Sequence, residues 1–166
     1  MDVHVPDYEE RDQAFCDICE EVGFILLDPV DPPAVIDLSG PYHQATVQLS
    51  GAVQGSVLIA GPLDGLKDMV ANVLDVDDED DPQPAIHFLQ ELANIAAGVF
   101  VGLVTDSTGI CDYSIPAACE MDPQQWRDCC RDSSTRCYAS DEGALIWRCL
   151  LQETATGRIL RQERSE

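Results

Sequence analysis

The sequence predicts an α+β fold in which an antiparallel sheet packs against one long helix. Residues 45–51 and 55–60 both alternate between apolar and polar side chains across a short glycine-bounded turn, which is typical of a β-hairpin. Residues 136–140 and 144–151 flank an acidic turn that ends in glycine, and they predict a second hairpin. From about residue 85 to 104, apolar residues recur at helical spacing over roughly five turns.

The remaining elements follow from the same periodicities. Residues 8–23 and 63–74 each carry an apolar stripe at helical spacing, so both are predicted helices. The proline-rich connector 28–33 cannot continue the first of them. Residues 110–116 are typical of a strand broken by proline, and 122–134 are either irregular or one short helix.

Length and charge limit the class of protein. The 166 residues fit one domain, 1–166, with 1–33 as an N-terminal helix and connector and 154–166 as a flexible charged tail. The net charge of -22 argues against nucleic-acid and membrane partners, because it repels phosphate backbones and anionic headgroups. No apolar run approaches the roughly 18 to 20 residues that span a bilayer, and no signal peptide is apparent, so we expect a cytoplasmic protein.

Eight cysteines in a chain without an export signal indicate reduced thiols rather than disulfides. Cys16 and Cys19 form a C-x-x-C in the middle of a predicted helix, whereas a thioredoxin-like motif follows a strand and opens a helix. Cys129 and Cys130 are adjacent, and no second C-x-x-C is present to complete a zinc site. We therefore expect structural thiols and no metal site, with a metal or redox role as the weaker alternative.

The long helix has two faces. Its apolar stripe consists of Phe88, Leu89, Leu92, Ile95, Ala96, Val99 and Leu103. A second face groups residues at i, i+4, i+7 and i+11, namely His87, Glu91, Asn94 and Gly98. Glu91 and Asn94 lie about 60° apart around the axis and about 4.5 Å apart along it, so their side chains emerge side by side. Ala93, Ala97 and Gly98 are small and are expected to keep the surrounding surface low. The alternative is that Glu91 and Asn94 are ordinary solvated residues on an exposed helix face.

The segment Glu91-Leu92-Ala93-Asn94, followed by Pro116 and preceded by the hairpin of residues 47–59, resembles the CheC/CheX/FliY family of chemotaxis phosphatases. That family's motif is an acidic or serine residue, then E-x-x-N, then a proline roughly two dozen residues downstream. The resemblance covers residues 42–152, and a single E-x-x-N matches the single-site CheX-like branch. Two positions depart from the pattern: His87 replaces the acidic or serine residue, and the spacing from Asn94 to Pro116 is one residue shorter.

The resemblance implies that this protein dephosphorylates the phosphoaspartate of a CheY-like response regulator. Asn94 would orient the attacking water, and Glu91 would pair with the regulator's own lysine. We expect His87, Gln90 and Gly98 to contact the partner. Any Mg²⁺ would belong to the regulator, so no cofactor of its own is expected, and a homodimer is implied, through sheet edges. The alternative is a non-catalytic adaptor that binds a response regulator or another signalling domain through the same helix.

Overall fold

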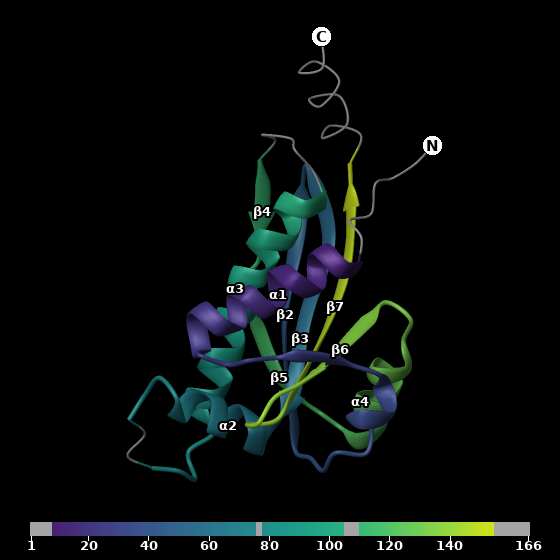
Figure 1. Ribbon diagram of the computed structural model, residues 1–166. Coiled ribbons are helices and arrows are strands. Elements are labelled where there is room, and N and C mark those ends of the chain that lie inside the picture. Colours follow the sequence, from purple (N-terminus) through teal and green to yellow (C-terminus); the bar gives the residue numbers. More distant parts are fainter. Residues whose placement is uncertain (1–7, 76–77, 105–109, 155–166) are drawn as a thin grey trace.

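The structure is a computed structural model that describes residues 8–75, 78–104 and 110–154 (Figure 1). In chain order its elements are α1 (Tyr8–Gly23), β1 (Asp28–Val30), the 3₁₀ turn η1 (Pro32–Ala34), β2 (Tyr42–Gly51), β3 (Val53–Pro62), α2 (Leu63–Ala71), α3 (Gln83–Val104), β4 (Cys111–Tyr113), β5 (Ala117–Met121), α4 (Pro123–Arg131), β6 (Thr135–Ala139) and β7 (Ala144–Glu153). The predicted α+β class is confirmed.

The strands form one seven-stranded antiparallel sheet in the order β1-β6-β7-β3-β2, with β4 and β5 both paired to the outer side of β2. The register pairs Leu49 with Tyr113 in β4 and Thr46 with Ala117 in β5. The two short strands therefore follow one another along the same edge, and residues 114–116 cross the gap between them.

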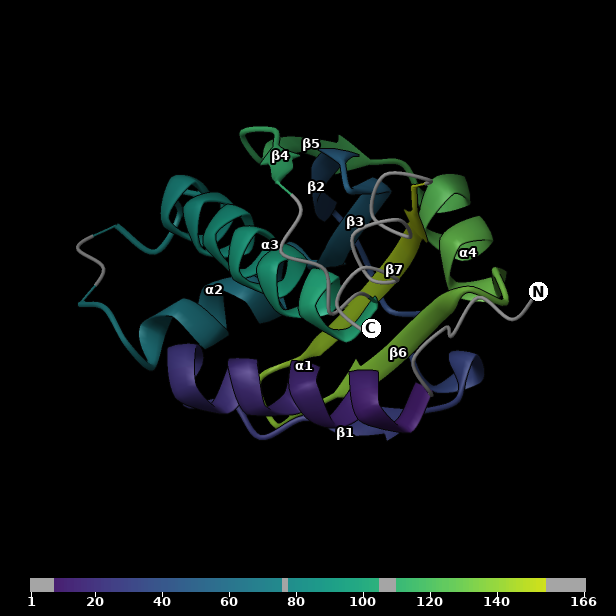
Figure 2. The ribbon, with the colours of Figure 1, turned by 90° about the horizontal axis from the view of Figure 1, so that it is seen from above.

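Helices cover both faces of the sheet. Figures 1 and 2 show α1 and α3 on one face and α4 on the other. Strand residues alternate accordingly, so Ile59 and Trp147 join the core under α1, α2 and α3, whereas Leu58 joins a second core on the opposite face. In that second core, Trp126 of α4 stacks on Tyr42 with ring centroids 4.8 Å apart.

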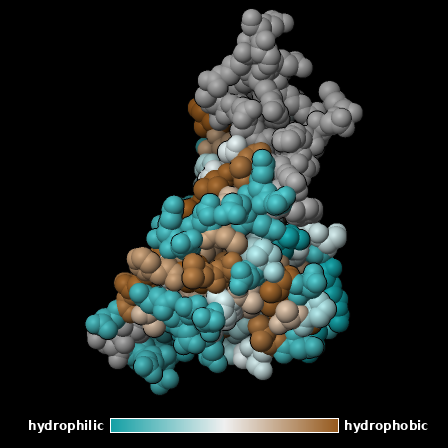
Figure 3. Space-filling model, in the orientation of Figure 1, coloured by the Kyte–Doolittle hydropathy of each residue, from teal (hydrophilic) through white to brown (hydrophobic). Residues whose placement is uncertain are grey.

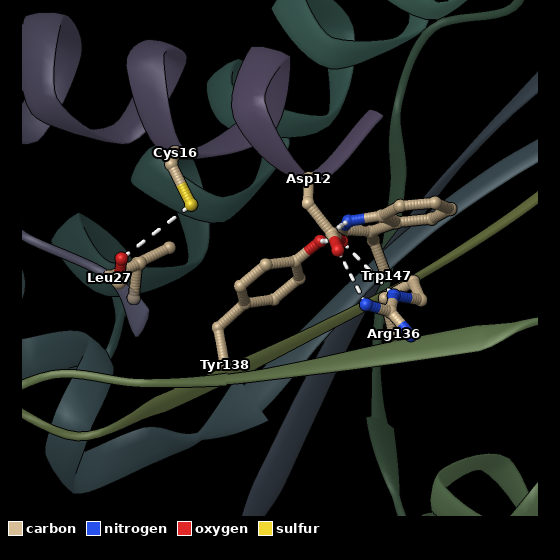
Figure 4. A network of polar contacts seen from close by, with 6 residues as sticks. All are labelled: Asp12, Cys16, Leu27, Arg136, Tyr138 and Trp147. Carbon is tan, nitrogen blue, oxygen red and sulfur yellow. Dashed lines mark hydrogen bonds and ion pairs between the residues drawn. The ribbon is translucent and has the colours of Figure 1, made fainter. Parts of the chain in front are cut away.

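A polar network fastens α1 to the sheet (Figure 4). The Asp12 carboxylate accepts hydrogen bonds from Arg136 Nε at 3.0 Å and Nη2 at 2.5 Å, and from the Tyr138 hydroxyl. Trp147 Nε1 in turn donates to the Tyr138 oxygen at 2.6 Å. Burial, followed by the hydrogen bond to Asp12, raises the pKa of Tyr138, so its hydroxyl remains a donor. The network joins the first helix to the last two strands.

Most predicted elements are confirmed, with several corrections. Both hairpins form, and β2 and β3 are longer than the periodicity indicated, because their turn is tight around Ala52. The proline-rich connector includes β1 and η1, and 123–131 is the short helix rather than irregular structure. β5 was missed, since residues 117–121 lie on an edge and lack a clear alternation. The predicted glycine stop at 109 and all of the predicted charged tail except Thr154 lie outside the described residues.

The helix α3 also corrects the expectation about apolar runs. Over Gln83–Leu103 it is long and apolar enough to cross a membrane by length and composition. It packs along β2 and β3 instead. Its buried side, which includes Leu89, Leu92 and Phe100, lies in the principal core.

Candidate functional site

The candidate site is the face of α3 that points away from the sheet. His87, Glu91, Asn94 and Gly98 are all exposed, as their helical spacing predicted. The opposite side is buried, and its fully covered residues include Leu89, Leu92, Ala93, Ala96, Ala97 and Phe100. The sheet therefore holds the helix rigidly, and the carboxylate of Glu91 and the amide of Asn94 are presented to solvent on the same side.

Two details of the predicted helix faces were wrong. Ala93 and Ala97 are completely buried, so they do not contribute to the accessible surface. Val99, which the stripe placed in the core, is 37% exposed. The buried stripe is centred closer to Ala93 and Ala97 than the sequence suggested, because the small alanines allow α3 to approach the sheet closely.

The surface beside Asn94 has no protruding side chain at positions 98 and 102, because both residues are glycine. A Cβ atom added at Gly98 or at Gly102 would meet nothing within 4 Å. Packing within the described part of the chain therefore does not require glycine at either position. Glycine in a helix interior is less stable than alanine by about 1 kcal/mol, so these residues leave space on the exposed face without benefit to the fold.

Gln90 lies at the border of this face and is half-buried. Its Nε2 donates a hydrogen bond of 2.9 Å to the carbonyl oxygen of Pro116. Sequence reasoning named Gln90 as a partner contact and Pro116 as part of a family motif, but it missed the bond between them. A contact across 26 positions carries no periodic signal, so only the folded chain brings the two residues together.

The arrangement is suited to a macromolecular partner rather than to a small molecule. Small ligands bind in concave, mostly apolar pockets, whereas Glu91 and Asn94 line neither of two hollows that the described residues form. The first hollow, of about 490 Å³, lies between α2 and the start of α3 and carries the carboxylates of Asp64, Asp68, Asp75, Glu79, Asp80 and Asp81. Over the described ranges no group of three or more His, Cys, Asp or Glu side chains could hold a metal ion.

The cysteines take no part in the face. All eight thiols are free, and five of them are buried. Cys16 Sγ donates to the carbonyl of Leu27 at 3.6 Å, and burial raises the pKa of Cys19, so the C-x-x-C belongs to the packing of α1. Cys130 lies in the second core with Trp126. These positions support the structural reading of the thiols.

The family model described as Chemotaxis phosphatase CheX matches residues 43–137 of this chain. A comparison with curated protein sequences found no match. Several solved structures are similar in fold. A chain of a CheX-CheY-BeF3-Mg complex from Borrelia burgdorferi has a TM-score of 0.61 and 18% identity, over 90% of this chain and 100% of that chain.

Two further structures have the same fold at similar divergence. Chemotaxis protein CheX from Vibrio vulnificus has a TM-score of 0.63 and 12% identity, over 87% of this chain and 95% of that chain. A CheC-like superfamily protein from Shewanella sp. PV-4 has a TM-score of 0.62 and 13% identity, over 92% and 99% of the two chains. At such identities the likeness establishes the antiparallel sheet and its long helix.

Proposed function

The chain belongs to the CheX family of chemotaxis phosphatases, and on that premise we propose that it hydrolyses the phosphoaspartate of a CheY-like response regulator. The observation that carries the proposal is the joint exposure of Glu91 and Asn94 on one side of α3. A solved relative is itself a complex of CheX with CheY, which supports a regulator of that class as the partner.

The chemistry needs only positioning from this protein. An acyl phosphate is already activated, and an in-line attack requires a water fixed opposite the leaving carboxylate. The Asn94 amide suits this task, because its oxygen accepts a hydrogen bond from the water and the group does not titrate. The water oxygen bonds to phosphorus as the bond from phosphorus to the aspartyl oxygen breaks. The protons of the water stay with inorganic phosphate or pass to solvent, and the aspartate is released as a carboxylate. The Mg²⁺ that such a phosphoryl group needs belongs to the regulator, so this protein supplies no cofactor.

Glu91 supplies the charge that fixes the complex. A regulator of this class carries a lysine beside its phosphorylated aspartate, and the exposed Glu91 carboxylate would pair with its ammonium group. His87 is exposed one turn before Glu91 and also lies within reach of the partner. We place the complex in the cytoplasm, and we retain the homodimer, formed through sheet edges, as part of the proposal.

The proposal is tested with Asn94→Ala and a panel of phosphorylated regulators from the same organism. We expect phosphate release to fall by about 100-fold or more, because a water-orienting group of this kind contributes several kcal/mol. Asn72→Ala is the matched control, since it removes an exposed amide at the C-cap of α2, which does not belong to α3 and whose Nδ2 donates to the Glu142 carboxylate. The assignment would be refuted if Asn94→Ala released phosphate at the wild-type rate from every regulator that the wild-type protein dephosphorylates.

One observation favours a second candidate, a non-catalytic adaptor. His87 stands where the family motif has an acidic or serine residue, and it is exposed beside the pair. An adaptor would bind the phosphorylated regulator through α3 without increasing its rate of phosphate loss. Measuring binding and hydrolysis on the same regulator separates the two functions.

A further inference from the structure

The turn between β4 and β5, residues 114–116, borders the exposed face of α3. The hydrogen bond from Gln90 to Pro116 fixes this contact. Gln90 precedes Glu91 by one position and Asn94 by one helical turn, so its side chain lies along the edge of the face that both of them occupy. A partner that covers Glu91 and Asn94 therefore also meets this turn.

Both ends of the turn are held. The Ser114 N–H donates to the Gln48 carbonyl at 2.9 Å, and the Gln48 N–H donates to Ser114 Oγ at 2.8 Å. At the other end Pro116 is held by Gln90, and its ring restricts the backbone of the preceding residue. The backbone of Ile115 is thus fixed between the sheet edge and the helix.

Ile115 itself is left in solvent. Its side chain is 88% exposed, and the neighbouring Tyr113 is 42% exposed. Single exposed apolar residues are common on protein surfaces and do not by themselves indicate a binding site. Here the exposed isoleucine is held on a fixed turn beside the candidate site. An apolar contact also suits a protein of net charge -22, because the regulator's phosphorylation pocket is itself acidic and charge alone would oppose the encounter.

On the function proposed above, we infer that Ile115 is an apolar anchor for the phosphorylated receiver domain and that Gln90 is a positioning residue that acts through it. Gln90 sets the place of the turn, and Ile115 is buried against the apolar surface next to the partner's phosphoaspartate. Neither residue touches the reacting atoms. Their effect is on binding of the regulator rather than on the hydrolytic step.

The test measures the Kd for the regulator carrying beryllofluoride and Mg²⁺ in place of the phosphoryl group, together with KM and kcat for phosphate release. Ile115→Ala should weaken binding about tenfold and raise KM to match, with kcat unchanged. Ile110→Ala is the matched control, because Ile110 is 82% exposed at the far end of β4. It should bind as the wild type does.

Gln90 is tested by two substitutions of similar length. Gln90→Met removes the donor to Pro116 and should raise KM several-fold. Gln90→Lys retains a donor and should keep KM near the wild-type value. Combining Gln90→Met with Ile115→Ala should weaken binding no further than Ile115→Ala alone, because both act through one contact. A purely structural role for Gln90 would lower the melting temperature without this dependence on Ile115.

The outcomes for the anchor and for the proposed function are distinct. Equal binding by Ile115→Ala and Ile110→Ala would overturn the anchor, even if Asn94→Ala had lost hydrolysis. If the wild type bound the regulator without hydrolysing it, the catalytic proposal would fail, and the binding comparison would still decide whether Ile115 is the anchor.

Discussion

Gly98 occupies a position on α3 where packing of the described residues does not require glycine. It lies four positions after Asn94, on the same exposed side, and an added Cβ atom would meet no other atom within 4 Å. Alanine would be the more stable choice in a helix interior. We propose that the absence of a side chain here leaves room for a partner that approaches the helix closely.

Gly98→Ala should consequently have opposite effects on stability and on partner binding. We expect the free energy of unfolding to rise by about 0.5–1 kcal/mol, because glycine lowers helix stability through backbone entropy. We expect the affinity for the regulator to fall, since the methyl group occupies the space left for the partner. Urea denaturation and a binding titration measure the two effects. An unchanged affinity would show that no partner approaches this point of the helix.

At the scale of the element, α1 is joined to the domain by an ion pair as well as by its apolar stripe. Phe15 contacts Phe100 and Tyr138, with ring centroids 6.4 and 5.0 Å apart. Asp12, one turn earlier, accepts from Arg136 and Tyr138. The side chain of Asp12 is only 14% exposed and that of Arg136 is 36% exposed, so solvent screens the pair in part.

Asp12→Ala should destabilise the protein by about 2–3 kcal/mol, since it removes the carboxylate to which Arg136 and the Tyr138 hydroxyl both donate. Partial exposure of Arg136 places the expected loss below that of a fully buried pair. Chemical denaturation measures the change. Asp17→Ala, at an exposed position of the same helix, is the control and should stay within about 0.5 kcal/mol. Equal losses from the two variants would show that the network does not hold α1.

At the scale of the whole molecule, two cores on opposite faces of one sheet decide which thiols are accessible. Cys19 and Cys149 lie in the core under α1 and α3, and Cys130 and Cys137 in the core under α4. Burial raises the pKa of Cys149 to about 11. The exposed Cys119 lies on the edge strand β5, where Gln44 donates to its sulfur at 3.0 Å.

A thiol reagent at pH 8 should therefore label the native protein in separate phases. Cys119 should react first, and the buried thiols should react only as the domain unfolds, because the thiolate is the nucleophile and burial disfavours it. Spectroscopic labelling of the wild type and of Cys119→Ser measures this. A fast phase of unchanged amplitude in Cys119→Ser would contradict its assignment to Cys119 and would point to the half-buried Cys16 or Cys111.

Charge is the other property of the whole molecule. The surface in Figure 3 is largely hydrophilic and is broken by separate hydrophobic patches. Among the described residues, six carboxylates and Lys67 line the hollow between α2 and α3. A net charge of -22 destabilises a compact state through self-repulsion. Salt screens such repulsion over a Debye length of about 10 Å at 0.1 M.

The melting temperature should accordingly rise by a few degrees as NaCl increases from about 10 to 300 mM, with about 1 kcal/mol corresponding to 2–4 °C. Scanning calorimetry measures the shift. The double variant Glu79→Gln, Asp80→Asn removes two charges from the acidic hollow and should show a smaller response to salt. A melting temperature independent of salt would mean that the acidic residues do not repel one another measurably.

Periodicity alone determined the long helix, both hairpins and the side on which Glu91 and Asn94 emerge, because these follow from local geometry that repeats along the chain. Their roles in hydrolysis stay a prediction that phosphate release will test. Tertiary structure decided what lacks a local signal. It buried Ala93 and Ala97 against the sheet and exposed Val99. It also joined Gln90 to Pro116 across 26 positions and Asp12 to Arg136 across 124. Contacts between distant segments depend on how the elements pack, and no spacing within one element encodes them.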